Sequence, residues 1–333
     1  MVPLSVLDLS PIVEGGDAGQ SLRNSLDLAR HVERLGYRRF WMAEHHNLPG
    51  IASAATAVAL AHVASGTSTI RLGAGGIMLP NHAPLIIAEQ FGTLAALHPG
   101  RIELGLGRAP GSDQLTLRAM RRNLFADDTQ FPQDVVELMA YFQEPEPGQR
   151  LQAVPGAGLQ VPIWILGSSL FGAQLAAILG LPFAFASHFA PAMLSQAVTI
   201  YHQRFQPSAQ LNEPYVMLGV VVVAAESDEE ARFLFSSLQQ STLNNRIGHP
   251  GRVPPPVRDF DKNLDPQAVA ILADSQSQAI VGGPETVRRG LDAFIERTHA
   301  NEVMITANIF DHDSRKRSFE IVADLAGLST GSC

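Results

Sequence analysis

The sequence predicts an α/β protein in which eight parallel strands, each followed by a helix, close into a (β/α)8 TIM barrel. Short runs rich in β-branched and aromatic residues alternate with longer stretches whose apolar residues recur at helical spacing. The length of 333 residues suits one barrel domain, and a hydrophobic content of 46% suits a large core. The same alternation also permits an open, doubly wound sheet, which is the alternative architecture.

Each expected strand is a short apolar run between turn-forming or polar residues. These runs are 4–10, 38–45, 69–79, 101–107, 161–168, 181–187, 215–224 and 301–307. The helical stretches are 18–35, 53–65, 85–97, 128–142, 170–179, 190–205, 228–244, 265–278, 284–298 and 314–326. In the first helix, Leu22, Leu26 and Ala29 share one face, Asp17 can cap its start and Gly36 can end it.

The chain between strands seven and eight is longer than a simple crossover requires. Its residues 248–261 include Pro254, Pro255 and Pro256 in succession, which exclude both helix and interior strand. We therefore expect residues 1–333 to form a single barrel domain with an insertion at 246–275, between strands seven and eight.

Composition and charge exclude several classes of protein. The net charge is -8 and no basic stripe with interleaved aromatic residues occurs, so we expect no nucleic-acid partner. The single cysteine, Cys333, excludes an intrachain disulfide and a cysteine-based zinc site. The first ten residues do not resemble a signal peptide, and apolar runs such as 216–225 are too short to span a bilayer. We therefore expect a soluble, cytoplasmic protein without a membrane partner.

Two adjacent histidines end the second strand, in the motif FWMAEHHNLPG at 40–50. Side chains alternate along a strand, so one of His45 and His46 should face the barrel mouth and the other the helical shell. A histidine at the mouth could act as a general acid or base, or both could be structural. We expect no metal site, because ligands on one strand favour H-x-H spacing and no second His/Asp cluster at a strand end completes a site.

The third strand contains an unusual number of glycines, in LGAGGIMLP at 72–80. Glycine weakens a strand interior, and Gly73, Gly75 and Gly76 mark either barrel curvature or the close approach of another group. The functional alternative is a flat ligand lying against bare backbone.

Two further motifs point to an anion. ELGLGRAPGSD at 103–113 is not a dinucleotide fingerprint, because its third glycine, Gly111, comes one place late and no helix is expected there. Arg108, directly after the fourth strand, suits phosphate or carboxylate, or a salt bridge at the rim. Ser168 and Ser169 begin the helix after strand five, where they could bind an anion or simply cap the helix. VGGPETV at 281–287 opens another helix and is interpreted as structural.

Taken in order, these motifs resemble the bacterial luciferase-like flavin monooxygenase family, in particular its luciferase-like or alkanal monooxygenase subgroup. The resemblance rests on FWMAEHHNLPG, IRLGAGGIMLPNHAPLIIAEQF, HPGRIELGLGRAPGSD, WILGSSLFGAQLAAILGLPFAFASHF and VGGPETV, and spans Ser5 to about Leu325. It implies a (β/α)8 barrel that binds reduced FMN as a co-substrate at the strand ends. It also implies that His45 is catalytic and that a cis peptide bond joins Gly75 and Gly76 beneath the flavin ring.

The resemblance implies further that Arg108, Ser168 and Ser169 bind the FMN phosphate. Many members of the subgroup carry a serine or threonine where this chain has Gly172, which leaves only a backbone N–H for the phosphate. The reactive cysteine of the luciferases is replaced by Gly107, so light emission is not implied.

The implied reaction oxygenates a small organic substrate, an aldehyde being one candidate, with O2 and reduced FMN through a C4a-hydroperoxyflavin. No NAD(P)H fingerprint is present, so we expect a separate flavin reductase as partner. The insertion would be a lid, and helix 53–65 could form a homodimer interface. The alternatives are a deazaflavin-dependent hydride-transfer oxidoreductase and a non-catalytic flavin-binding protein; a metal-dependent hydrolase is least favoured.

Overall fold

A computed structural model describes residues 1–109, 114–120 and 130–328 of the chain, so the end of the 103–113 motif and Cys333 lie outside the described residues. The described strands form one sheet in the order β6-β5-β4-β3-β2-β1-β9-β7-β8, and β6 also pairs with β7. All these pairings are parallel. The β6–β7 pairing closes a barrel, which confirms the (β/α)8 prediction and excludes the open sheet.

The barrel strands agree with the expected runs to within a few residues. They are β1 (Leu4–Asp8), β2 (Arg39–Met42), β3 (Arg71–Met78), β4 (Ile102–Gly107), β5 (Ile163–Gly167), β6 (Phe183–Phe185), β7 (Val216–Ala224) and β9 (Glu302–Thr306). The short β8 (Ile280–Gly282) was not predicted; it pairs with Val222–Ala224 outside the barrel. Three residues are too few to show a periodic pattern, and their pairing depends on the barrel already being formed.

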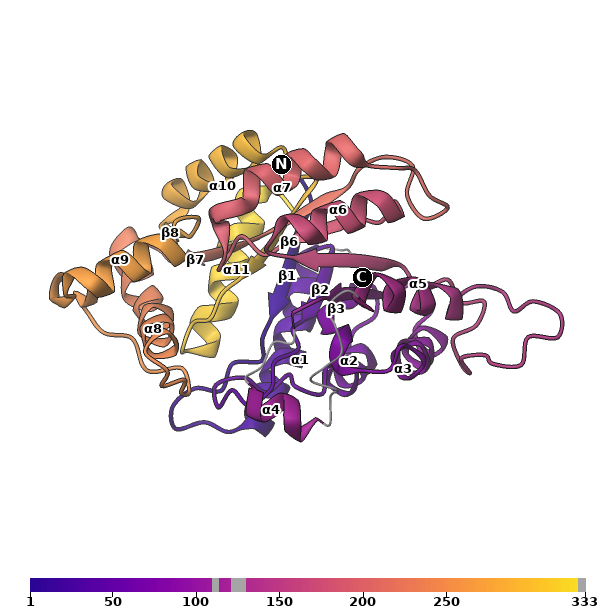
Figure 1. Ribbon diagram of the computed structural model, residues 1–333. Coiled ribbons are helices and arrows are strands. Elements are labelled where there is room, and N and C mark those ends of the chain that lie inside the picture. The colour runs from indigo at the N-terminus through magenta and orange to yellow at the C-terminus, as the bar shows by residue number, and fades with distance from the viewer. Residues whose placement is uncertain (110–113, 121–129, 329–333) are drawn as a thin grey trace.

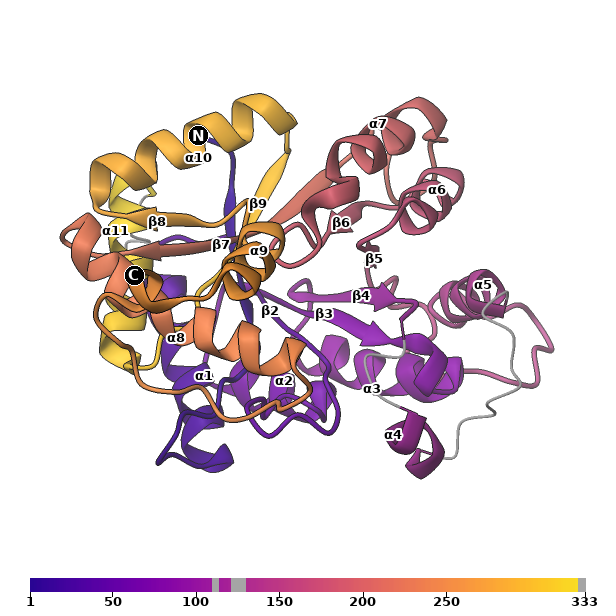
Figure 2. The same ribbon diagram turned by 60° about the vertical axis from the view of Figure 1, so that its left-hand side comes forward.

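Helices surround the strands (Figures 1 and 2). They are α1 (Ala18–Arg34), α2 (Thr56–Ser65), α3 (Pro84–Leu97), α4 (Gln114–Ala119), α5 (Phe131–Tyr141), α6 (Leu170–Leu179), α7 (Leu194–Arg204), α8 (Asp228–Arg246), α9 (Pro266–Ser275), α10 (Pro284–Thr298) and α11 (His312–Ala326), with short 3-10 turns at Leu79–Asn81, Pro191–Met193 and Phe260–Asn263. Helix α4 lies where a loop was expected. Asp17 caps α1 by accepting from the Gln20 N–H at 2.8 Å, as predicted.

The barrel interior is built in layers. At its lower end Arg39 pairs with Glu302 and Glu103, and its guanidinium lies 4.8 Å from the Trp164 ring centroid. A side chain of β2 can reach β5 and β9 in this way only through the inside of the barrel. Above this polar layer lies a buried apolar cluster, which consists of Leu7, Trp41, Ala43, Trp164, Ala184, Met217 and Met304. This apolar layer forms a floor at the C-terminal ends of the strands, where barrel enzymes carry their sites.

The chain between β7 and β9 contains α8, α9, β8 and α10. Two backbone hydrogen bonds join the loop after α8 to the loop between β1 and α1. The Glu14 N–H donates to the Val253 carbonyl at 2.8 Å, and the Val253 N–H donates to the Ile12 carbonyl at 2.9 Å. The Arg252 guanidinium adds a hydrogen bond to the Gly16 carbonyl at 2.9 Å. Within the described ranges, no helix is long and apolar enough to cross a membrane.

Candidate active site

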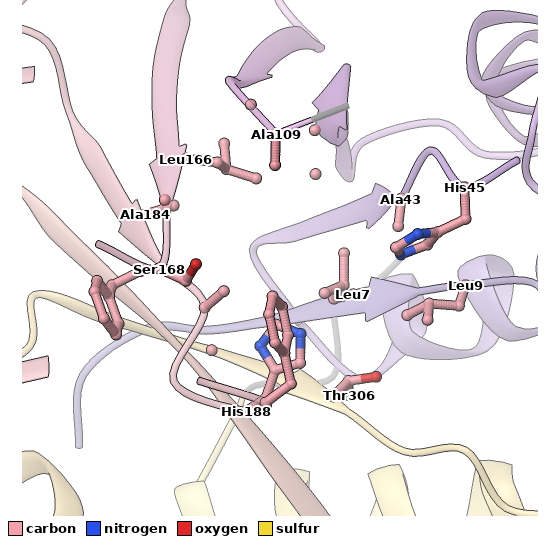
Figure 3. Close-up of a pocket in the computed structure, with 18 of the residues that line it drawn as sticks. Leu7, Leu9, Ala43, His45, Ala109, Leu166, Ser168, Ala184, His188 and Thr306 are labelled. Atoms are coloured by element: carbon pink, nitrogen blue, oxygen red, sulfur yellow. The ribbon is translucent and has the colours of Figure 1, made fainter. Parts of the chain in front are cut away.

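A large pocket opens at the C-terminal ends of the barrel strands, with a volume of about 730 Å³ (Figure 3). Its floor is the apolar layer described above, including Leu7, Trp41 and Met304. Every residue that the sequence predicted for catalysis or cofactor binding lines this pocket: His45, Gly75, Gly76, Arg108, Ser168, Ser169 and Gly172. The closed barrel brings these seven residues together from four separate segments of the chain.

The two adjacent histidines have different surroundings. Strand β2 ends at Met42, earlier than expected, and His45 then lines the pocket, whereas His46 does not. Nε2 of His46 lies 2.7 Å from the buried Glu44 carboxylate, and Nε2 of His82 lies 2.8 Å from the same oxygen, Oε1. The other Glu44 oxygen accepts from the Met78 N–H at 3.0 Å. His46 therefore belongs to a network that holds the ends of β2 and β3 together.

Glu44, His46 and His82 also form an arrangement that could hold a metal ion, since their ligand atoms lie within 4.8 Å of one another. Glu44 and His46 lie in the loop after β2, and His82 follows the 3-10 turn after β3. Burial by itself raises the pKa of Glu44, but the hydrogen bonds from His82, His46 and the Met78 N–H outweigh burial and hold the pKa below its usual value. The carboxylate is thus ionised and already hydrogen-bonded.

His45 is a neutral imidazole at pH 7. Burial lowers its pKa below the ordinary value, and this effect exceeds the opposing attraction of Glu44. No hydrogen bond joins His45 to another described residue. A neutral ring offers one N–H donor and one acceptor nitrogen, so His45 can give or take a proton at a ligand in the pocket.

The glycines of β3 form a bare surface beside the floor. The register of β3 against β4 shifts between Ala74 and Ile77, and the Gly75–Gly76 peptide bond is cis, as the resemblance implied. A Cβ atom on Gly75 would lie 2.9 Å from Cδ1 of Leu7, and one on Gly76 would lie 2.8 Å from a carbonyl oxygen of β4. Any side chain here would disturb the floor, so this part of the wall is suited to a flat ring lying against backbone.

Groups that could bind an anion line the same pocket. Arg108 follows β4, with its guanidinium carbon 4.2 Å from the Phe171 ring centroid, and no carboxylate among the described residues pairs with it. Within the described part of the chain, Arg108 therefore forms no salt bridge at the rim. Ser169 is the N-cap residue of α6, but its hydroxyl makes no capping hydrogen bond. The hydroxyl and the positive end of the α6 dipole remain available to an anion.

Gly172 lies in the first turn of α6, close to β5. A Cβ atom there would lie 3.4 Å from Cα of Gly167 and 3.5 Å from the Leu166 carbonyl oxygen. These are ordinary contact distances, so packing does not require glycine at this position. Gly172 lines the pocket together with Ser168 and Ser169.

Several polar residues that line the pocket were not predicted from the sequence. Three follow barrel strands: His188 after β6, Thr306 at the end of β9 and Asn308 just beyond it. The others lie in or next to α8 and α9: Thr242, Asn245, Arg246, Ser275 and Gln276. Burial lowers the pKa of His188 to about 4, and nearby His45 contributes in the same direction. Its Nδ1 lies against Gly219, which leaves no room for a Cβ atom at that position. The motif ASHF at 186–189 follows an expected strand as EHH does, so the strand-end argument applied to His45 would also have found His188.

Comparison with known proteins identifies the class. The family model for luciferase-like monooxygenases matches residues 2–302, and the chain belongs to this family. It is 51% identical over 324 residues to a luciferase-like monooxygenase of Escherichia coli K12, covering 97% of each chain. It is 37% identical over 237 residues to the N-acetyl-S-alkylcysteine monooxygenase of Bacillus subtilis, covering 69% of this chain and 70% of that one.

Solved structures agree with this membership. Apo-MsnO8 superimposes with a TM-score of 0.88 at 34% identity, over 99% of both chains. Two distant structures share the fold alone. The oxygenating constituent of 3,6-diketocamphane monooxygenase, in complex with FMN, is 18% identical with a TM-score of 0.72, covering 97% of this chain and 96% of that one. A secondary alcohol dehydrogenase dependent on coenzyme F420 is 13% identical with a TM-score of 0.67, covering 98% and 99%.

Proposed function

We propose that this protein is an FMN-dependent monooxygenase that uses reduced FMN and O2 to oxygenate a small organic substrate. The observation that carries the proposal is the juxtaposition in one pocket of a bare glycine surface and Arg108, with which no carboxylate of the described residues pairs. A flat ring with an anionic tail is the ligand that such a pair accommodates. Membership of the family and the monooxygenase relatives support the same conclusion.

The residues divide into two groups by their chemistry. Arg108, Ser168, Ser169 and the N–H of Gly172 would hold the phosphate, and the Gly75–Gly76 backbone would support the ring. Bound reduced FMN would supply the activation of O2. His45, neutral and free of hydrogen bonds to described residues, would exchange a proton with the substrate. The apolar floor would keep water from the reacting atoms.

The proposal also includes a reductase partner, a lid over the pocket and a homodimer. A separate reductase would supply the reduced flavin. Segment 246–275 would act as a lid; α9 within it contributes Ser275 to the pocket, and its loop is bonded to the β1–α1 loop. A second copy of the chain would pack on α2, where Val58 is 71% exposed.

The alternative is a hydride-transfer enzyme that uses a deazaflavin, because an F420-dependent dehydrogenase shares the fold. Titration of the purified protein with FMN and with coenzyme F420, followed by flavin fluorescence, distinguishes the two. We expect tight binding of FMN and incorporation of isotopically labelled dioxygen into a product. Preference for F420 and an unlabelled product would support hydride transfer instead.

A further inference from the structure

Three buried polar atoms of pocket-lining residues have no hydrogen-bond partner among the described residues: the hydroxyl of Thr306, Oδ1 of Asn308 and Nδ1 of His188. The first two belong to one segment, at and just after the end of β9. The Thr306 side chain is only 4% exposed. An unpaired polar group in such an environment costs about 1–3 kcal/mol, so native proteins rarely keep one without a reason. We call Thr306 and Asn308 the unpaired wall.

The unpaired wall lies across the barrel from the anion site. Around the closed sheet, β9 is separated from β4 by β1, β2 and β3 on one side and by β5, β6 and β7 on the other. Arg108 follows β4, whereas Thr306 ends β9 and Asn308 lies two residues beyond it; both line the pocket. Figure 3 shows Thr306 and Ser168 on different sides of the pocket. A cofactor anchored at Arg108 and lying on β3 leaves the β9 side to a second ligand.

The two orphaned atoms make different demands on that ligand. The Asn308 carbonyl oxygen can only accept, so the ligand must supply an N–H or O–H. The Thr306 hydroxyl can donate or accept, and it donates where the ligand offers an acceptor oxygen. An aldehyde, ketone or ester supplies only the acceptor, and an ionised carboxylate likewise has no proton to donate. A ligand hydroxyl offers donor and acceptor from one oxygen, whereas a neutral amide offers N–H and C=O from separate atoms, one for each side chain. The apolar floor suits the hydrocarbon attached to such an amide.

We propose that the unpaired wall is the substrate-recognition surface and that it selects small, mainly apolar substrates bearing a neutral amide. This inference rests on the proposed function, since it assigns the other side of the pocket to FMN. His188, after β6, lines the same pocket as a neutral ring, whereas the charged lining residues are Arg108, after β4, and Arg246, at the end of α8.

The test compares two probes of the same shape, N-methylhexanamide and methyl hexanoate. The amide carries an N–H group where the ester carries an oxygen atom. Binding of each is measured by calorimetry on the FMN-loaded protein. We expect the amide to bind at least about fivefold more tightly than the ester, the equivalent of one neutral hydrogen bond.

Thr306→Val, which removes the hydroxyl at constant shape, should weaken amide binding about fivefold, and Thr306→Ser should retain it. Asn308→Ala should abolish the preference for amide over ester.

Thr199→Val is the matched control, because it makes the same substitution outside the pocket, at a hydroxyl that donates to the Ser195 carbonyl at 2.9 Å. Its amide affinity should equal that of the wild type. Equal binding of amide and ester, or no binding of the amide at its solubility limit, would overturn the proposal. So would a loss of FMN affinity in Thr306→Val, since the wall would then belong to the cofactor. Titrating FMN alone first keeps the outcomes separate: failure of FMN to bind contradicts the proposed function, whereas the probe comparison on the free protein still tests the wall.

Discussion

Arg39 and Glu302, 263 residues apart in the chain, form a bidentate ion pair inside the barrel. Nε of Arg39 donates to Oε1 of Glu302 at 2.7 Å, and Nη2 of Arg39 donates to Oε2 of Glu302 at 2.9 Å. Both side chains are almost completely buried. Glu302 also accepts from the hydroxyl groups of Ser5 and Tyr215, and Arg39 pairs with Glu103. This layer supports the apolar floor of the pocket from below.

Breaking this buried pair should therefore destabilise the whole barrel. Glu302→Gln keeps the shape of the side chain but removes the charge that faces Arg39, and we expect a loss of about 3 kcal/mol in the free energy of unfolding. Urea unfolding measures it. Glu226→Gln is the control, because Glu226 pairs with Arg317 at the exposed surface and should cost less than about 1 kcal/mol. Equal losses in the two variants would mean that the buried layer does not hold the barrel together.

The anion site predicts a specific defect in cofactor binding. Arg108→Ala should weaken FMN binding by about 1.5–3 kcal/mol, the contribution of a charge-assisted hydrogen bond, measured by flavin fluorescence titration. Arg258→Ala is a matched control, since that guanidinium lies over Phe233 at 4.6 Å but outside the pocket. An unchanged dissociation constant in Arg108→Ala would remove Arg108 from the phosphate site.

A hydroxyl group added at position 172 should raise the affinity for FMN. A Cβ atom there meets its nearest neighbours at 3.4–3.5 Å, which is ordinary contact, so a serine fits at the start of α6. Gly172→Ser should strengthen FMN binding by about 1 kcal/mol through one added hydrogen bond to phosphate. Gly172→Ala supplies the same Cβ without the hydroxyl and should leave the affinity unchanged. Equal affinities for the serine and alanine variants would show that the hydroxyl does not reach the phosphate.

His45 should matter for turnover rather than for binding. His45→Asn removes the titrating nitrogen while keeping a polar side chain, so FMN affinity should stay within about twofold and the rate should fall about 10²–10⁴-fold. Fluorescence titration and labelled-oxygen incorporation measure the two quantities separately. His46→Asn serves as the comparison: His46 contacts Glu44 rather than the pocket, so its loss should reduce stability more than rate. A full rate in His45→Asn would reject its role.

Most of the site could be predicted because its residues follow strand ends, and strand ends are visible as local patterns. His45, Arg108 and Ser168 are of this kind. The unpaired state of Thr306 could not be predicted, because the absence of a partner is a property of the assembled barrel. The Arg39–Glu302 pair was equally hidden, since nothing local joins residues on strands so far apart in sequence. Strand β8 was missed for the same reason, because it forms only against the outer end of β7.

His188 predicts how stability should depend on pH. Burial lowers its pKa in the folded protein to about 4, whereas an unfolded histidine titrates near its ordinary value of 6.5. Between these two values the unfolded chain binds more protons than the folded one, so folding stability is complete above about pH 6.5 and falls as the pH drops toward about 4.

From about pH 7.5 to about pH 5 the wild-type protein should lose on the order of 2 kcal/mol more than His188→Asn, which lacks the group. Urea unfolding of both proteins at the two pH values measures the difference, and all other titrating groups are common to both. Parallel losses in the two proteins would show that the ring is readily protonated in the folded state. In that case His188 would carry a positive charge below about pH 6.5, and in that range the pocket would favour an anionic substrate group over a neutral amide.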